Sequence, residues 1–276
     1  MTTSTVQTGT APVNGAQLYY EVAGTGTPFV MIHAGVADSR QWNNEFAYFA
    51  QQYRALRFDL RGFGRSEPVA GEYSHLGDLS ALLEYLVPDG PLILMGCSMG
   101  GGLAMDYALT HPAQVAALIM VGSGPSGLEI DAPEPAKFAE VEQASQAGDL
   151  DLVAELETQI WFDGMNRTPA QVDPIMRRLA YAMNRNALAL EARGLGTRVP
   201  GTATTAAGRL GELSMPVLAI VGDNDLPYLL LAADIMAEQI AGATKVLIAD
   251  AAHLPNLDQP AEFQRIVAGF LEDVRA

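Results

Sequence analysis

Seven short runs of apolar residues recur along the chain, and most pairs of neighbouring runs leave room for a helix between them. The runs are AQLYYEV (16–22), PFVMIH (28–33), RALRFDL (54–60), PLILMG (91–96), VAALIMVG (115–122), PVLAIVG (216–222) and KVLIA (245–249). Several are apolar at nearly every position, as strands buried on both faces must be. This alternation predicts an α/β fold, with a mostly parallel central sheet flanked by helices.

The alternation stops between residues 125 and 210, where helical patterns follow one another without a strand. We therefore predict a core domain formed by residues 1–124 and 211–276, with a helical cap, 125–210, inserted between two strands of one sheet. An insertion at that position emerges at one end of the sheet, so we expect it to act as a lid over a site there. The alternative is a helical layer remote from any site.

Two helices have clear start signals. Asp173 and Pro174 have the residue types of an N-cap and a first helical position, and Gly194 is placed to end the helix that they begin. The segment 260–274 follows Pro260 and repeats apolar residues at helical spacing.

Composition narrows the possible partners. Among 276 residues there are 16 basic and 32 acidic side chains, a formal charge of −16, which disfavours nucleic acid and anionic membrane surfaces. The start of the chain, 1–13, has no basic or apolar signal region, so we interpret it as a loose polar lead-in. The longest apolar stretch, 91–105, is too short for a membrane span. These features predict a cytoplasmic protein that acts on a small molecule.

The single cysteine, Cys97, excludes an internal disulfide and a thiolate-rich metal site, and we predict no metal and no cofactor. A glycine pattern, GSGPSG at 122–127, fits a dinucleotide-binding fingerprint, but that fingerprint must open a helix at once. Pro125 and the DAPEP that follows argue against such a helix, so an oxidoreductase is disfavoured.

Gly96, Cys97, Ser98, Met99 and Gly100 form a Gly-x-Ser-x-Gly pattern between a predicted strand and a predicted helix. In so sharp a turn, side chains at the two glycines would collide with each other or with neighbouring strands. The turn would expose the hydroxyl above the sheet, beside the unpaired amides of a helix N-terminus. We predict that Ser98 is a nucleophile and that Cys97 faces the core; the alternative for Ser98 is a capping serine in a glycine-rich turn.

A nucleophilic serine needs a histidine base and an acid to orient it, in the chain order Ser, acid, His. Of four histidines, only His253 follows a late predicted strand. Asp225 is the preferred acid over Asp223, which is closer to its strand; Asp250 and Asp258 lie in the histidine's own loop and are weaker candidates.

An oxyanion would be stabilised by two backbone amides, for which Met99 and Gly35 are the best candidates. Gly35 lies in the loop MIHAGVADSRQW, where we expect His33 to stabilise the loop and Trp42 to belong to the core.

Taken together, these motifs resemble those of the α/β-hydrolase superfamily. The matching segments are HAG (33–35), DLRGFGRS (59–66), GCSMGG (96–101), HPAQV (111–115), VGDND (221–225) and AAHLPNLDQP (251–260). The resemblance implies the α/β-hydrolase fold, a triad of Ser98, Asp225 and His253, and oxyanion amides from Gly35 and Met99. It also implies that three further residues belong to a structural turn beside the site: Asp59, Arg61 and Gly62. Ala34 departs from the His-Gly that many members have here.

The elbow and core look like the serine-nucleophile branch, which includes small esterases, 3-oxoadipate enol-lactonases and cofactor-free haloperoxidase-like enzymes. Dehalogenase and epoxide hydrolase relatives use an aspartate nucleophile, so those activities are disfavoured. We predict a serine hydrolase that cleaves small to medium carboxylic esters through an acyl-enzyme on Ser98. The alternatives are an enol-lactonase or carbon–carbon bond (diketone) hydrolase, or a non-catalytic small-molecule-binding protein. The oligomeric state stays open.

The predicted cap holds eight basic and twelve acidic side chains, which favours neutral substrates over carboxylates. A single arginine could still receive an anion, and the candidates are Arg177, Arg178 and Arg185. Four apolar cap residues are candidate substrate-binding walls: Trp161, Phe162, Met176 and Met183.

Overall fold

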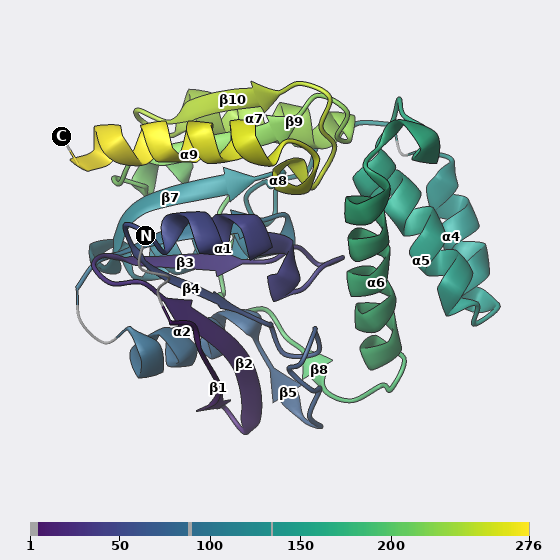
Figure 1. Ribbon diagram of the computed structural model, residues 1–276, viewed down its shortest axis with the longest axis horizontal. Coiled ribbons are helices and arrows are strands. Elements are labelled where there is room, and N and C mark those ends of the chain that lie inside the picture. Colours follow the sequence, from purple (N-terminus) through teal and green to yellow (C-terminus); the bar gives the residue numbers. More distant parts are fainter. Residues whose placement is uncertain (1–4, 88–89, 134, 276) are drawn as a thin grey trace.

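The computed structural model describes residues 5–87, 90–133 and 135–275. Its main sheet has eight strands in the order β1-β2-β4-β3-β6-β7-β9-β10 (Figure 1). The strands are β1 (Gln7–Val13), β2 (Ala16–Ala23), β3 (Pro28–Ile32), β4 (Arg54–Phe58), β6 (Leu92–Cys97), β7 (Val115–Val121), β9 (Val217–Gly222) and β10 (Thr244–Ile248). From β4 to β10 the neighbours run parallel, whereas β2 is antiparallel to both β1 and β4. The predicted mostly parallel sheet is confirmed.

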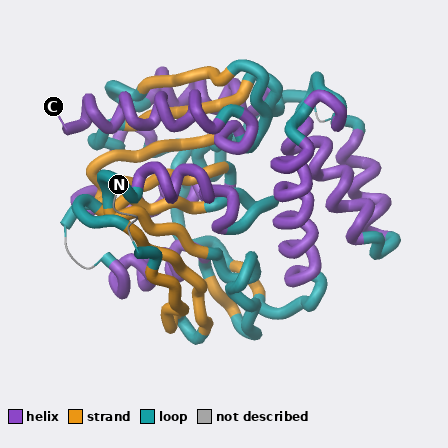
Figure 2. Tube along the Cα trace, viewed as in Figure 1, coloured by secondary structure: helices purple, strands orange, loops and turns teal. Residues whose placement is uncertain are grey.

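Helices cover both faces of this sheet, as Figure 2 shows. One face carries α1 (Asn43–Phe49) and α9 (Pro260–Arg275), and the other carries α2 (His75–Leu86), α3 (Met99–Thr110) and α7 (Pro227–Gln239). A single short turn, α8 (Pro255–Asp258), precedes α9. Helix α9 begins at Pro260, as its sequence predicts.

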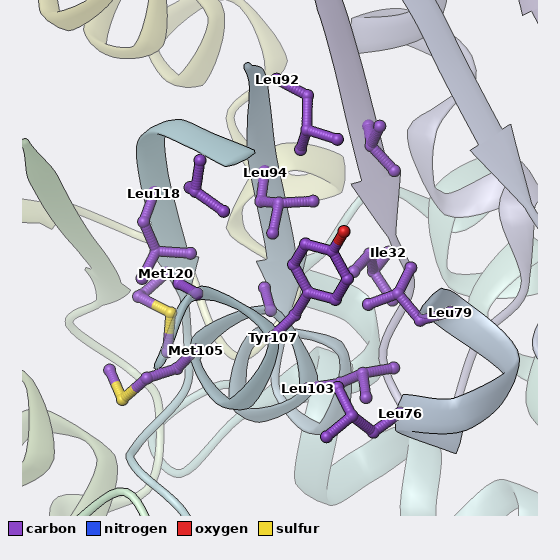
Figure 3. Close-up of a cluster of buried hydrophobic side chains, with 14 of the residues drawn as sticks. Ile32, Leu76, Leu79, Leu92, Leu94, Leu103, Met105, Tyr107, Leu118 and Met120 are labelled. Carbon is purple, nitrogen blue, oxygen red and sulfur yellow. The ribbon is translucent and has the colours of Figure 1, made fainter. Parts of the chain in front are cut away.

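The core divides into two layers because successive strand side chains alternate between faces. In β3, Val30 and Ile32 pack toward α2 and α3, whereas Phe29 and Met31 pack toward α1 and α9. Figure 3 shows the first layer, in which Tyr107 of α3 lies among leucines and methionines from β6, β7 and α2. Burial on both sides fixes the register of the parallel strands, and with it the edge where their carboxyl ends meet.

The predicted loose polar lead-in, 1–13, is wrong over Gln7–Val13, which form β1, and residues 1–4 lie outside the described part of the chain. β1 pairs with β2 along its whole length and forms one edge of the sheet. Only Ala11 and Val13 are buried, so an apolar pattern is nearly absent from the sequence. Pro12 is compatible with this position because an edge strand leaves some amides unpaired.

The segment 125–210 contains α4 (Lys137–Gln146), α5 (Leu150–Thr158) and α6 (Pro174–Glu191). These helices stand beside the carboxyl ends of the parallel strands (Figure 1). As predicted, Asp173 caps α6 through hydrogen bonds from the amides of Ile175 and Met176. The helix ends at Glu191, and the left-handed Gly194 follows in the next turn.

One short strand was not expected in this segment. β8 (Thr197–Arg198) pairs in parallel with β5 (Glu72–Tyr73), and together they form a second, two-stranded sheet below α6 (Figure 1). A two-residue strand has too few residues to show any periodicity. Within the described part of the chain, no helix is both long and apolar enough to cross a membrane.

Candidate active site

Ser98 occupies the turn between β6 and α3, where its backbone has φ 53° and ψ −118°. Such a conformation is rare for a residue with a side chain and costs about 1–3 kcal/mol. The amide of Ser98 donates to the carbonyl of Val121 at 2.8 Å, and its carbonyl accepts from the amides of Gly101 and Gly102 at 3.0 Å. These bonds hold the strained turn, which leaves Ser98 partly exposed at the carboxyl end of the sheet.

The glycines around Ser98 are required by close backbone approach. A Cβ built on Gly96 would lie 2.2 Å from the carbonyl oxygen of Gly100. A Cβ on Gly100 would lie 2.5 Å from the carbonyl oxygens of Ile32 and His33. Real Cβ atoms do not approach backbone so closely, so the physical reason that the sequence suggests for these glycines holds in the structure.

His253 and Asp225 form a buried pair in the loops that follow β10 and β9. The Nδ1 atom of His253 lies 3.0 and 3.1 Å from the two carboxylate oxygens of Asp225. Asp225 also accepts from the amide of Leu226 at 2.8 Å. Hydrogen bonding at Nδ1 fixes the orientation of the imidazole, and Nε2 has no hydrogen-bond partner among the described residues.

The end of β7 joins the serine turn to this histidine–aspartate pair. Val121 accepts the hydrogen bond from the Ser98 amide, and a Cβ built on the next residue, Gly122, would lie 3.1 Å from both Asp225 Oδ2 and His253 Nδ1. On the other side, the Cys97 thiol contacts the carbonyl oxygen of His253 at 3.5 Å. Residues far apart in sequence therefore meet at one edge of the sheet.

The two residues expected to supply the oxyanion amides, Gly35 and Met99, lie side by side. A Cβ built on Gly35 would be 3.7 Å from the Cβ of Met99. Among the described residues, neither the Gly35 nor the Met99 amide donates a hydrogen bond. A pair of free amides beside a serine can bind a developing negative charge.

A buried polar network supports the Gly35 loop. The amide of Ala34 donates to Gln41 Oε1 at 2.9 Å, and Gln41 Nε2 donates to Asn256 Oδ1 at 3.4 Å. Asn256 Nδ2 donates to the carbonyl of Gln41 at 2.8 Å and to Glu45 Oε2 at 3.0 Å. None of these three side chains stands out in the sequence, because polar residues 215 positions apart give no local pattern.

Two cavities at this edge of the sheet share Met99 in their linings. One, of about 360 Å³, is lined by Ser98, Met99 and residues from the β7 loop and α7. The other, of about 490 Å³, is lined by Gly35 and Met99 and by residues of α6 and the β8 segment. Their sizes are in the range of small-molecule sites.

The four predicted substrate walls are placed differently from one another. Trp161 is half-buried and its ring lies 4.5 Å from the His253 ring, centroid to centroid. Phe162 and Met183 are fully buried in the core, and Met176 packs against the same cluster. None of the four lines either of the two cavities. An apolar stripe shows that a helix face is buried, but not what covers it.

The alternative acids have structural partners. Asp223 Oδ1 accepts from Asn224 and from the amide of Ala251, and so shapes its loop. Asp258 is buried and pairs with Arg167 at 2.8 Å. Burial raises the pKa of Asp258, although Arg167 opposes the shift. Asp250 has a left-handed backbone with φ 54° at the turn after β10.

The remaining candidates of this region are core or turn residues. Burial raises the pKa of the Cys97 thiol to about 12, so it is not a thiolate nucleophile. His33 is buried, bonds the carbonyl of Ala34 and accepts from the amide of Leu60. Trp42 is fully buried. Asp59 accepts from the amides of Ser39 and Arg65 and shapes the turn beside the site.

Two of the three predicted cap arginines form ion pairs with carboxylates. Arg177 pairs with Glu155 and Asp163, and Arg185 pairs with Asp151. Arg178 is exposed. None of the three lines the two cavities. Within the described residues, no group of three or more His, Cys, Asp or Glu side chains could hold a metal ion.

Known proteins resemble this chain in sequence and in fold. Residues 29–266 match a model described as the alpha/beta hydrolase family. A pimeloyl-[acyl-carrier protein] methyl ester esterase of Nitrosospira multiformis is 28% identical over 257 residues, covering 89% of this chain and 95% of the relative. A 2-hydroxy-6-oxononadienedioate/2-hydroxy-6-oxononatrienedioate hydrolase of Dechloromonas aromatica is 29% identical over 76% of this chain and 74% of its own.

A solved structure shares the fold over nearly its whole length. The enol-lactonase from Burkholderia xenovorans superposes with a TM-score of 0.77 at 22% identity, covering 95% of this chain and 99% of that one.

Proposed function

Because the chain belongs to the alpha/beta hydrolase family, we propose that it is a serine hydrolase that cleaves small to medium carboxylic esters. The observation that carries the proposal is the buried His253–Asp225 pair, which packs against the β7 end that also anchors the strained Ser98 turn. The esterase and hydrolase relatives support hydrolysis of this general class.

In the proposed mechanism, Ser98 Oγ attacks the carbonyl carbon of the ester while His253 Nε2 takes the hydroxyl proton. The amides of Gly35 and Met99 donate hydrogen bonds to the oxyanion of the tetrahedral intermediate. His253 then gives the proton to the departing alcohol, which leaves an acyl group on Ser98. A water molecule, deprotonated by the same histidine, releases the carboxylic acid and restores the serine. Asp225 holds the imidazole and stabilises its protonated form.

We propose that the segment 125–210 serves as the cap of this site. Its helices stand beside the carboxyl ends of the strands (Figure 1), and α6 lines the larger cavity. Trp161 lies in a single π-helical turn, Gln159–Asp163, and its carbonyl accepts from the amide of His253 at 3.2 Å. The cap is thereby tied to the base, and the Trp161 ring can shield the imidazole from water.

Hydrolysis rates of p-nitrophenyl esters of increasing acyl length test the proposal. Ser98→Ala and His253→Ala should each lower kcat by roughly four to six orders of magnitude without loss of folding. Arg178→Gln, an exposed change on α6, serves as a control that should keep normal rates. Near-normal activity in folded Ser98→Ala would exclude Ser98 as the nucleophile.

A carbon–carbon bond hydrolase is the second candidate function, and the hydrolase relative from Dechloromonas aromatica favours it. The same triad would then act on a vinylogous diketone. Lactones and vinylogous diketones belong in the same substrate panel, and the highest kcat/KM identifies the bond that is cleaved. A folded protein that hydrolyses none of them would favour a non-catalytic binding role.

A further inference from the structure

Arg198 is an exposed arginine that lines the larger cavity. Among the residues that the structure describes, it forms no ion pair, whereas its neighbour Arg193 pairs with Glu67. The Nη1 atom of Arg198 instead contacts the sulfur of Met99 at 3.2 Å. Met99 directly follows the proposed nucleophile. A free guanidinium is notable in a chain with a net charge of −16.

The backbone of Arg198 is held in place. In the two-stranded sheet, Arg198 lies opposite Tyr73, and the amides on either side of it donate to the carbonyls of Gly71 and Tyr73 at 2.9 and 2.8 Å. A Cβ built on Gly196 would lie 2.6 Å from the carbonyl oxygen of Val69, so the segment 196–199, which we call the strap, packs closely against Val69. The backbone that carries the exposed Arg198 side chain is therefore fixed, so binding a ligand does not require this segment to become ordered.

His75 lines the same cavity and has an unused polar atom. The side chain is 7% exposed, and its Nδ1 atom is buried without a hydrogen-bond partner. Burial, assisted by the charge of Arg198, lowers the pKa of His75 to about 3. His75 is therefore neutral at physiological pH and can donate one N–H without adding charge. An unpartnered buried polar atom is costly unless a ligand or water satisfies it.

Two carboxylates also line this cavity. Glu157 accepts from Asn184 Nδ2 at 2.8 Å, and burial raises its pKa. Glu191 is exposed at the end of α6. Neither forms an ion pair with Arg198. The cavity thus has an acidic side on the cap helices and a basic side on the strap.

We propose that Arg198, with His75, binds a carboxylate carried by the ester substrate, so that the substrate is a half-ester of a dicarboxylic acid or a similar anionic ester. This inference rests on the proposed serine hydrolase activity. The ester group lies at Ser98, and the chain that bears the carboxylate extends past Met99 into the larger cavity. The guanidinium supplies a charge-assisted hydrogen bond, which a neutral ester cannot use.

The test compares two matched ester series. One contains p-nitrophenyl monoesters of dicarboxylic acids from succinate to suberate, and the other contains the same esters with the free carboxylate capped as a methyl ester. Arg198→Gln should lower kcat/KM for the best carboxylate-bearing ester by about 10- to 100-fold, since it removes a charged hydrogen bond. The capped ester should change by less than about two-fold. His75→Phe should show a smaller loss in the same direction, and Arg178→Gln should show none.

The outcomes separate the two levels of the proposal. Equal effects of Arg198→Gln on both series, or no effect, would overturn the carboxylate site while the serine hydrolase proposal stands. If neither series is hydrolysed, the hydrolase proposal fails, and calorimetric titration with monomethyl suberate decides the binding question. Binding that weakens at least about 10-fold in Arg198→Gln supports the site. Absent binding, or equal binding by both proteins, contradicts it. Thermal unfolding verifies that each variant is folded.

Discussion

Gln41 and Asn256 are 215 residues apart in the sequence and hydrogen-bond each other through both side chains and the Gln41 carbonyl. Gln41 also holds the amide of Ala34, next to the proposed oxyanion residue Gly35. Asn256 lies three residues after His253. These buried hydrogen bonds therefore fix the loop that carries the proposed oxyanion hole to the loop that carries the proposed base.

Asn256→Ala should damage both stability and turnover. The change removes the Asn256 donor from the Gln41 carbonyl and from Glu45 Oε2 in a fully buried site, at a cost of about 2–4 kcal/mol in the free energy of unfolding. It should also lower kcat by about 10- to 100-fold with a smaller change in KM, because the oxyanion loop loses its support. Urea unfolding and steady-state kinetics measure both. Asn44→Ala, an exposed change in the first turn of α1, is the control. Unchanged kcat in Asn256→Ala would mean that the network is only structural.

Glu45 should make stability fall as pH rises. Burial raises its pKa from 4.5 to about 7, against the hydrogen bonds from Asn256 and Gln264. The folded chain then binds more protons than the unfolded chain between these two values. The favourable contribution of protonated Glu45 to the free energy of unfolding is complete below pH 4.5 and is lost as pH rises through about 7. It amounts to roughly 3 kcal/mol. Glu45→Gln removes this dependence. The free energy of unfolding of the variant, relative to that of the wild-type chain, should therefore increase from pH 5 to pH 8.5. If the difference in unfolding free energy between the variant and the wild-type chain is the same at pH 5 and pH 8.5, the assignment is contradicted.

Arg167 should stabilise the loop of His253 from the cap side. It pairs with Asp258 at 2.8 Å and donates to the carbonyl of Asp250 at 2.7 Å. Asp258 in turn accepts from the amide of Ala252. Arg167→Met leaves a buried carboxylate unpaired and should cost about 3–5 kcal/mol of unfolding free energy. Adding Asp258→Asn should restore a large part of that loss, as measured in urea. A single variant as stable as the wild type would show that the pair contributes nothing.

Gly96→Ala should destabilise the chain by about 3 kcal/mol or more, because the new Cβ meets the backbone of Gly100. Gly269→Ala, in α9, is the matched control, because a Cβ there meets nothing within 4 Å. It should be neutral or stabilising by up to about 1 kcal/mol, since alanine favours helix. Thermal unfolding of the two variants gives the comparison. Equal midpoints would refute the steric reason for Gly96.

Much of the fold follows from local pattern. The buried parallel strands are apolar on both faces, and each was predicted within about two residues of its observed ends. β1 could not be predicted from its sequence, because an edge strand buries only alternate residues, here Ala11 and Val13. β8 could not be predicted either, because a two-residue strand depends on its partner rather than on its own sequence.

Some residues of the candidate site can likewise be predicted from local sequence, whereas others depend on tertiary structure. Ser98 can be singled out from its glycine neighbours, and Asp225 and His253 from their positions after strands. Arg198 could not be singled out, because most arginines in the predicted cap look alike in sequence. Its distinction is the absence of a carboxylate partner among the described residues, which only tertiary structure reveals. The burial of Phe162 likewise depends on packing that a helical stripe does not specify.

Covalent labelling with a fluorophosphonate tests the central claim most directly, because the reagent phosphonylates a serine that a neighbouring histidine activates. Intact mass spectrometry followed by peptide mapping should find one adduct, on Ser98. Labelling should be lost in Ser98→Ala and strongly slowed in folded His253→Ala. An adduct on another residue, or equal labelling in all three proteins, would contradict the account.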